Sequence, residues 1–244
     1  MKIRTFEVCA GYDSQLMALE RLKKNHSDFD YECIGWSEIE PSAIALHNAC
    51  FPSLSGKNFG DMTKIDWSKV ADFDLLTYST PCQSVSQAGK HEGIEEGSNT
   101  RSSILWFTRN AIITKRPKYL LMENVEALVQ TKFIGFFNKW RKELESYGYV
   151  NYAKVVNAAD CGVPQNRKRV FMLSIRNDGD KIDYHFPRKT KLKKHLVDVL
   201  EENVDEKYFL SDALLCKEKF VPNEWKEPMG AAIRTRSEGK WIKG

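Results

Sequence analysis

Hydrophobic positions in the first 177 residues follow two alternating patterns, which predict strands and helices in turn. Short apolar runs predict strands over residues 3–8, 31–36, 75–78, 119–122, 152–156 and 170–175. Other segments repeat apolar residues every three or four positions and predict helices over about 14–24, 41–49, 102–115 and 131–147. Beyond residue 177 this periodicity fades, and we predict there only a short helix over 196–201.

Two of these helices indicate which side chains face a core. In the first, Leu16, Leu19 and Leu22 are predicted to share one face. The long helix over 131–147 is amphipathic and should end at Gly148. Its predicted inward side chains are Phe133, Phe136, Phe137, Trp140 and Leu144.

The repetition of strand and helix predicts an α/β fold of the Rossmann-like type. Its sheet should be mostly parallel and doubly wound, with helices on both faces. Ligands of such sheets bind beyond the carboxyl ends of the strands. We therefore expect functional residues in the segments that follow strands.

Composition and charge exclude some classes of protein. The chain has 244 residues, 42% of them hydrophobic, which suits one large domain with a sizeable core. No apolar run approaches the roughly 20 residues of a membrane span, and the start lacks a signal-peptide core, so we predict a cytoplasmic protein without membrane association. The net charge of +4 is compatible with nucleic acid but also with many other enzymes.

The six cysteines are scattered, with no Cys-x-x-Cys pair and no histidines clustered beside them. Neither a metal site nor a disulfide framework is expected. The basic run over 188–195 is interpreted as a solvated linker, with a phosphate-contacting segment as the alternative.

Three segments carry candidate chemistry. Cys82 follows the strand at 75–78, Glu123 follows the strand at 119–122, and Arg167 precedes the strand at 170–175. A thiol, a carboxyl and a guanidinium together suit covalent attack on an electron-poor heterocycle. Taken singly, each has a simpler interpretation: a buried cysteine, a helix-start carboxylate and a solvated basic turn.

The segment after the first strand is a candidate binding loop. Cys9, Ala10 and Gly11 lead into a helix whose N-terminus offers free N–H groups, although a tight turn would look the same. Glu38 ends the second strand, where a carboxylate commonly holds a ribose diol. Asp61 precedes the third strand and could hold an adenine amino group, or could be an ordinary cap.

Taken together and in this order, these segments resemble the DNA cytosine-5 methyltransferase family. The matching residues are the Ala10-Gly11 loop, Glu38, Asp61, Pro81-Cys82-Gln83, Glu123-Asn124-Val125 and Gln165-Asn166-Arg167-Lys168-Arg169. The resemblance covers residues 1–177. It implies the methyltransferase version of the Rossmann-like fold, S-adenosylmethionine as methyl donor, no metal, and cytosine in double-stranded DNA as acceptor.

The resemblance also implies residue roles. Cys82 would be the nucleophile, and Glu123, with a raised pKa, would hold the ring nitrogen and exocyclic amine of cytosine. Arg167 would bind the cytosine carbonyl oxygen, and Arg169 and Gln165 would brace the site or a phosphate. The implied donor-binding residues are Cys9, Ala10, Gly11, Tyr12, Ser14, Glu38, Ile39, Asp61, Met62, Pro81 and Ile104. The base would be flipped out of the duplex, and the segment over 84–101 would close over DNA.

The chain departs from the family pattern at several positions. The family loop usually reads Phe-Ala-Gly-x-Gly-Gly, whereas this chain has Cys9, Asp13 and Ser14 in place of the phenylalanine and the last two glycines. Ile39 stands where a tryptophan often stacks on adenine. These changes bear on donor affinity.

Residues 178–244 contain nothing like the closing motifs of the family. We therefore expect an incomplete family member: a donor-binding catalytic domain over 1–177, then a linker and the start of a target-recognition region over 178–244. A second chain would supply the rest if the enzyme is split.

Other functions remain open at this stage. An RNA cytosine-5 methyltransferase is the nearest alternative, although its tRNA branch carries a Cys-Phe-Thr signature that this chain lacks. A silent DNA- or donor-binding module is a second, and a thiol-redox protein or an exocyclic-amine methyltransferase fits less well. The compact N-terminus suggests a bacterial or phage enzyme acting at the nucleoid, in restriction-modification or in another role.

Overall fold

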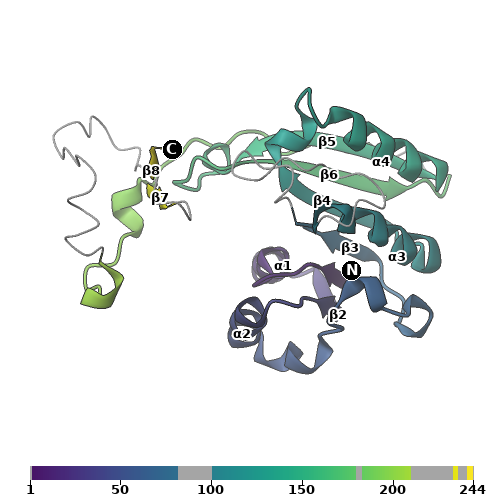
Figure 1. Cartoon of the computed structure of the whole chain (residues 1–244), viewed down its shortest axis with the longest axis horizontal. Helices are drawn as coiled ribbons and strands as arrows, with labels where there is room; N and C mark the ends of the chain where they lie inside the picture. The colour runs from purple at the N-terminus through teal and green to yellow at the C-terminus, as the bar shows by residue number, and fades with distance from the viewer. Residues whose placement is uncertain (1, 82–100, 180–182, 210–232, 236–240, 244) are drawn as a thin grey trace. The chain divides into compact units, whose positions relative to one another are not determined.

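A computed structural model describes residues 2–81, 101–179, 183–209, 233–235 and 241–243. These residues form two compact units (Figure 1). The first unit comprises Met1–Val156 and Lys168–Phe186, and the second comprises Asn157–Arg167 and Pro187–Gly244. Cys82 and the predicted closing segment lie outside the described residues.

The first unit is built on a six-stranded sheet in the order β2-β1-β3-β4-β6-β5. The strands are β1 (Lys2–Val8), β2 (Asp30–Ser37), β3 (Leu75–Tyr78), β4 (Tyr119–Val125), β5 (Tyr149–Asn157) and β6 (Lys168–Arg176). β1 pairs in parallel with β2 and β3, and β3 pairs in parallel with β4, whereas β6 is antiparallel to β4. The predicted mostly parallel Rossmann-like sheet is confirmed.

Helices cover both faces of this sheet. They are α1 (Ser14–Asn25), α2 (Pro41–Cys50), α3 (Thr108–Lys115) and α4 (Ile134–Ser146). Neighbouring residues of β3 enter different cores: Leu75 packs with α1, and Leu76 packs with α3 and α4. This follows from the alternation of side chains along a strand, which sends successive residues to opposite faces.

Several predicted details were wrong. Leu22 is 43% exposed, unlike Leu16 and Leu19. The predicted helix over 102–115 is a 3-10 helix at Arg101–Phe107 followed by α3, and the predicted helix at 196–201 is a 3-10 helix over Leu196–Val199. β4 continues to Val125, so Glu123 lies inside a strand and does not follow one.

The second unit contains the segment between β5 and β6. A 3-10 helix at Ala158–Asp160 is followed by a bridge between Cys161 and Thr190, and Lys189 pairs with Asp160 at 2.9 Å. The short strands β7 (Ile233–Thr235) and β8 (Trp241–Lys243) pair in antiparallel fashion, although the sequence had indicated no strand there.

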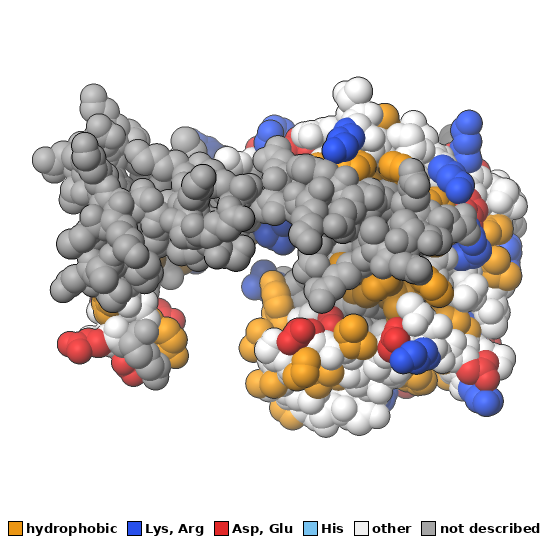
Figure 2. All heavy atoms as spheres, in the orientation of Figure 1, with side chains coloured by type: hydrophobic (Ala, Val, Ile, Leu, Met, Phe, Trp, Pro, Cys, Tyr) orange, Lys and Arg blue, Asp and Glu red, His pale blue; other side chains and the backbone are white. Residues whose placement is uncertain are grey.

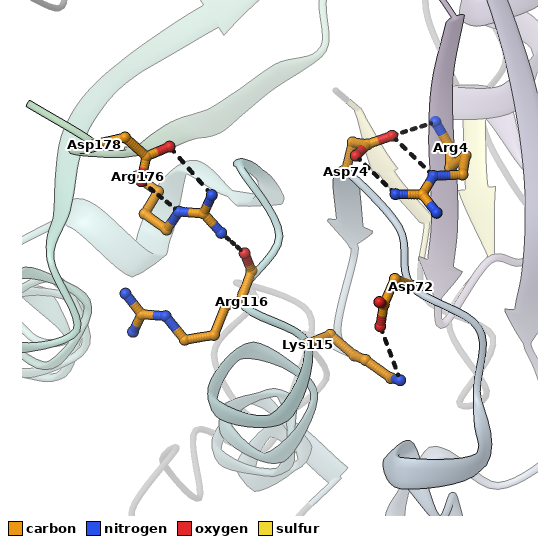
Figure 3. A network of polar contacts seen from close by, with 7 residues as sticks. All are labelled: Arg4, Asp72, Asp74, Lys115, Arg116, Arg176 and Asp178. Carbon is orange, nitrogen blue, oxygen red and sulfur yellow. Dashed lines mark hydrogen bonds and ion pairs between the residues drawn. The ribbon is translucent and has the colours of Figure 1, made fainter. Parts of the chain in front are cut away.

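Ion pairs hold the elements of the first unit together at the amino ends of the parallel strands (Figure 3). Arg4 of β1 donates to Asp74, which immediately precedes β3, and Lys115 of α3 pairs with Asp72 at 3.2 Å. Arg176 pairs with Asp178 and donates to the Arg116 carbonyl. This network lies at the edge opposite the predicted site. As surface pairs, its members each contribute roughly 0–1 kcal/mol.

Gly35 of β2 is required by packing. A methyl group at its Cα would lie 2.5 Å from a Phe59 ring carbon and 2.8 Å from a Phe6 ring carbon. We expect Gly35→Ala to lower the free energy of unfolding by about 1–3 kcal/mol through overpacking. Urea denaturation measures this, with Gly56→Ala as the control because Gly56 has open space around its Cα. Equal stability of the two variants would contradict the prediction.

Candidate active site

The carboxyl ends of the parallel strands meet at one edge of the sheet. Val8 pairs with both Ser37 and Tyr78, so β1, β2 and β3 end at one level. Tyr78 pairs with Met122, and β4 continues three residues further, to Val125. The segments that follow β1, β2 and β3 and the last residues of β4 therefore lie together. All the predicted donor-binding and catalytic residues of the first unit come from these segments, apart from Ile104, Arg169, and Asp61 and Met62, which lie in the connection between α2 and β3.

The loop after β1 is tied to the end of β2 through Glu38. The Gly11 N–H donates to Glu38 Oε2 at 3.0 Å, and Glu38 Oε1 accepts from the N–H groups of Ile39 and Glu40. Gly11 has φ +60° and open space beside its Cα. Glycine adopts this left-handed conformation at little cost, and its lack of a side chain leaves the backbone open to a ligand.

Asp61 is held near Glu38 by groups that we had not predicted. Asn58 accepts from the N–H of Glu38 and of Gly60, and Ser37 Oγ donates to the Gly60 carbonyl at 2.7 Å. Asp61 caps a 3-10 helix over Met62–Lys64, and hydrogen bonds from Thr63 lower its pKa. Gly60 is the residue in the sequence that signals the turn before Asp61, and in the structure it has φ +69°.

Cys9 lies where these segments converge. Its Sγ is 3.9 Å from Met62 Sδ. Burial, with the nearby carboxylates of Glu38 and Asp61, raises the pKa of the Cys9 thiol to about 12. Cys9 is therefore a neutral packing residue of the loop at physiological pH, and it is not an activated thiol.

The rest of the predicted donor site is partly open. Tyr12 is 48% and Ile39 65% exposed. Hydrophobic side chains are visible on the surface of the first unit (Figure 2). Ser14 is exposed, Pro81 is half-buried, and Ile104 packs against the core. An exposed aromatic ring and aliphatic side chain beside two carboxylates offer contacts for an adenosine.

Asp13 ends the loop and caps α1. It has φ +67°, and its Oδ1 accepts from the Leu16 N–H at 3.0 Å. The side chain is fully buried, and this burial raises the pKa of Asp13 to about 7. Part of the free energy of folding therefore depends on whether Asp13 carries a proton.

We expect Asp13→Asn to change how stability depends on pH. When folding raises the pKa of a carboxyl, its contribution to the free energy of unfolding is greatest below the unfolded pKa. For Asp13 this contribution is lost as the pH rises toward about 7. Asparagine tolerates positive φ and keeps a cap oxygen. The melting temperature of the variant minus that of wild type should therefore be about 4–8 °C higher at pH 8 than at pH 4.5. Parallel melting curves over this range would contradict the prediction.

The segment that carries Cys82 begins in the described part of the chain. Asn124 Nδ2 donates to the Thr80 carbonyl at 3.2 Å, and Gln15 Nε2 donates to Ser79 Oγ at 2.5 Å. Asn124 is 2% exposed, and its Oδ1 accepts from the Val125 N–H. Asn124 thus fastens the start of the Cys82 segment to β4. The Glu-Asn-Val motif had predicted a role for Glu123 but none for Asn124.

We expect Asn124→Ala to impair the reaction more than the binding of donor. Without the Asn124 amide, the buried Thr80 carbonyl loses this hydrogen bond, which lowers the free energy of unfolding by about 1–3 kcal/mol. The segment that leads to Cys82 is then no longer fastened to β4. The catalytic rate should fall about 10–100-fold while the Kd for S-adenosylmethionine changes less than about threefold. Single-turnover kinetics and calorimetry measure the two quantities. Asn151→Ala is the control, because Asn151 makes a similar bond to the Arg141 carbonyl outside this edge.

Glu123 and Arg169 are brought together as an ion pair. Arg169 Nε lies 3.0 Å from Glu123 Oε1, and both side chains are 21% exposed. Glu123 is opposite Phe171 in the antiparallel β4–β6 pair, which places Arg169 diagonally across from it. The role of Arg169 in bracing the site or a phosphate stays a prediction.

Gln165 and Arg167 belong to the second unit and are exposed. The backbone of this segment is held by Asn157, whose Oδ1 accepts from the Arg167 N–H at 3.0 Å and whose Nδ2 donates to Asn166. Asn157 was not predicted. The roles of Gln165 and Arg167 stay predictions.

Within the described residues, no group of three or more His, Cys, Asp or Glu side chains could hold a metal ion. No helix in that same part of the chain is long and apolar enough to span a bilayer.

A mostly parallel sheet with a glycine-containing loop after β1 and a carboxylate after β2 defines a Rossmann-like methyltransferase fold. The family described as C-5 cytosine-specific DNA methylase matches residues 3–243. The chain belongs to this family, as its motifs had predicted.

Known proteins agree with this assignment. The chain is 38% identical to the type II methyltransferase M2.ScrFI of Lactococcus lactis subsp. cremoris, over 86% of this chain and 71% of that protein. It is 34% identical to the orphan methyltransferase M.SssI of Spiroplasma monobiae, over 87% and 68%. The crystal structure of the S. pombe Dnmt2 methyltransferase matches the fold with a TM-score of 0.62 at 20% identity, over 91% of this chain and 65% of that one.

Proposed function

We propose that this protein transfers a methyl group from S-adenosylmethionine to C5 of cytosine in double-stranded DNA. The observation that carries the proposal is the shared edge of the sheet. There the Gly11–Glu38 loop contact, the Asn124-held start of the Cys82 segment, and Glu123 with Arg169 come together. This edge combines a place for an adenosine-containing donor with a carboxyl beside a cysteine-bearing segment.

The residues present fit the donor. S-Adenosylmethionine, when bound, supplies an electrophilic methyl group. Glu38, held by three backbone N–H groups, would accept from the ribose hydroxyls, and the open backbone at Gly11 would approach the methionine portion. Asp61 would accept from the adenine amino group, and Tyr12 and Ile39 would cover the base. These assignments remain proposals.

In the proposed reaction, the Cys82 thiolate adds to C6 of cytosine and makes C5 nucleophilic. C5 then takes the methyl group from the donor, a base removes the C5 proton, and the bond between Cys82 and C6 breaks. Glu123 would hold the ring nitrogen and the exocyclic amine during addition, with Arg169 keeping its side chain in place. Arg167 would stabilise charge at the cytosine carbonyl oxygen.

The cytosine must leave the duplex to reach these groups, because its C5 and C6 atoms are inaccessible to a nucleophile in a stacked helix. Relatives come from bacteria and from Bacillus phages, which supports action on DNA in the cytoplasm of a bacterium or an infected cell. Residues 178–244 lack the closing motifs of the family. We propose that those motifs come from a longer form of the protein or from a second chain.

The test is methyl transfer with product identification. The chain would be incubated with methyl-labelled S-adenosylmethionine and either duplex DNA or RNA, and nucleosides would be separated by mass spectrometry. Label in 5-methylcytosine from DNA supports the proposal. Label only in RNA would establish the RNA alternative, and label in N4-methylcytosine or N6-methyladenine would rule out the thiol-addition chemistry. If the chain transfers no label, the assay would be repeated with the C-terminal part of a relative added as a second polypeptide; continued absence of label would reject the assignment.

A further inference from the structure

A buried polar cluster lies beneath the loop that follows β1. Asp13 Oδ2 is 3.5 Å from His47 Nε2, and both side chains are fully inaccessible to solvent. Glu7 of β1 is also buried and accepts from Thr5 Oγ1. Asp13 thus links the loop to the last turn of α2.

The cluster is unusual for a protein interior. Within the described residues, Glu7 Oε2, Asp13 Oδ2 and both ring nitrogens of His47 have no hydrogen-bond partner, and His47 Nε2 is the polar atom that faces Asp13 Oδ2, at 3.5 Å. Burial raises the pKa of Glu7 and lowers the pKa of His47. The Asp13 carboxylate in turn raises the pKa of Glu7 and of Tyr31 and Cys33 of β2, which face it. Burying unpaired polar atoms costs free energy, so such a cluster calls for a reason beyond stability.

The position of the cluster supplies the reason. α2 begins three residues after Glu38, so His47 belongs to the helix that directly continues the ribose-binding segment. Its ring stacks on Trp36, two residues before Glu38, with centroids 3.6 Å apart. Asp13 belongs to the loop whose Gly11 contacts Glu38. The Asp13–His47 contact therefore joins the loop after β1 to α2, and the Gly11–Glu38 hydrogen bond joins the same loop to the segment that leads into α2.

Asp13 stands where the family pattern has glycine, and it keeps the left-handed conformation that glycine would adopt there. Cys9 and Gly11 are also left-handed, with φ +55° and +60°. Left-handed backbone is unfavourable for residues other than glycine and persists only when the surroundings hold it. Here the Asp13 side chain holds it by capping α1 and by reaching His47.

We propose that Asp13 is a positioning residue for donor binding, which anchors the loop over residues 9–13 to α2 through His47. This inference rests on the proposed function of that loop. It predicts that the departure from glycine at this position does not weaken the donor site and instead preorganises it.

The test compares donor affinity in the full chain. Asp13→Gly restores the family residue and removes the anchor, and His47→Phe keeps an aromatic ring on Trp36 but removes the nitrogen. We expect each substitution to raise the Kd for S-adenosylmethionine and for S-adenosylhomocysteine about 5–20-fold. Because both remove the same contact, the Kd of the double variant should not exceed the larger of the two single-variant Kd values. Asp13→Asn, which keeps the cap, should stay within about threefold of wild type. Arg4→Ala, at the opposite edge, is the control for general destabilisation.

A second measurement separates this inference from the proposed function. Hydrogen exchange of peptides covering residues 9–16 should become faster in Asp13→Gly and His47→Phe, while peptides of β3 and β4 exchange as in wild type. If wild type binds neither donor nor product, the donor proposal fails, yet exchange still decides whether the anchor exists. Unchanged exchange, or a Kd for Asp13→Gly within twofold of wild type, would overturn the inference.

Discussion

Cys82→Ala abolishes the covalent complex between this protein and duplex DNA that contains 5-fluorocytosine. Fluorine at C5 cannot leave as a proton would, so an enzyme that adds a thiolate to C6 stays attached and migrates as an adduct on a denaturing gel. Without the thiol no adduct forms, and methyl transfer to normal DNA should fall on the order of 10³-fold or more.

Cys50→Ala is the matched control for this experiment. Cys50 is a free, exposed cysteine and the last residue of α2, outside the predicted site. The Cys50→Ala variant should form the covalent adduct and methylate DNA as wild type does. An adduct that persists in Cys82→Ala and disappears in another cysteine variant would assign the nucleophile elsewhere.

The second large effect is expected at Glu123. Glu123→Gln keeps the shape of the side chain but cannot share a proton with cytosine, so the catalytic rate should fall about 10²–10⁴-fold. The Kd for S-adenosylmethionine should change by less than about twofold, because none of the proposed donor contacts involves Glu123. Rapid-quench kinetics measure the rate of the methyl-transfer step.

Arg169→Gln distinguishes bracing from chemistry. It removes the ion pair 3.0 Å from Glu123 and leaves the carboxyl in place, so its rate should fall less, by about tenfold. A Glu123→Gln variant that retained more than a tenth of the wild-type rate would contradict the role of the carboxyl. An Arg169→Gln variant as impaired as Glu123→Gln would move Arg169 into the chemistry itself.

The strands of the first unit were predictable because a buried strand needs a short apolar run. The boundaries of β4 were not predictable. Apolar character ends at Met122, but pairing with β6 carries the strand on to Val125, and β6 comes some forty residues later in the chain. Leu22 was misplaced for a simpler reason: six residues along a helix turn the side chain about 120° from Leu16.

The proposed donor-site residues could be put forward from the sequence, because an acidic residue at a strand end is a recognisable signal. The groups that hold them were not. Asn58 and Asn124 act through backbone atoms far away in the sequence, and a carbonyl partner has no sequence signature. Asp13 was noted as a departure from a glycine pattern, but its partner His47 could be found only once α2 had been placed beside the loop.

The ion-pair network at the amino ends of the strands has a practical consequence. Arg4, Asp72 and Arg176 hold their elements together on the side of the sheet away from the proposed chemistry (Figure 3). Substitutions there can therefore change resistance to heat without touching the edge of the sheet that is proposed to serve turnover on DNA. A laboratory seeking a more durable methylating reagent could vary the first edge freely, screening only for melting temperature, and keep the second edge untouched.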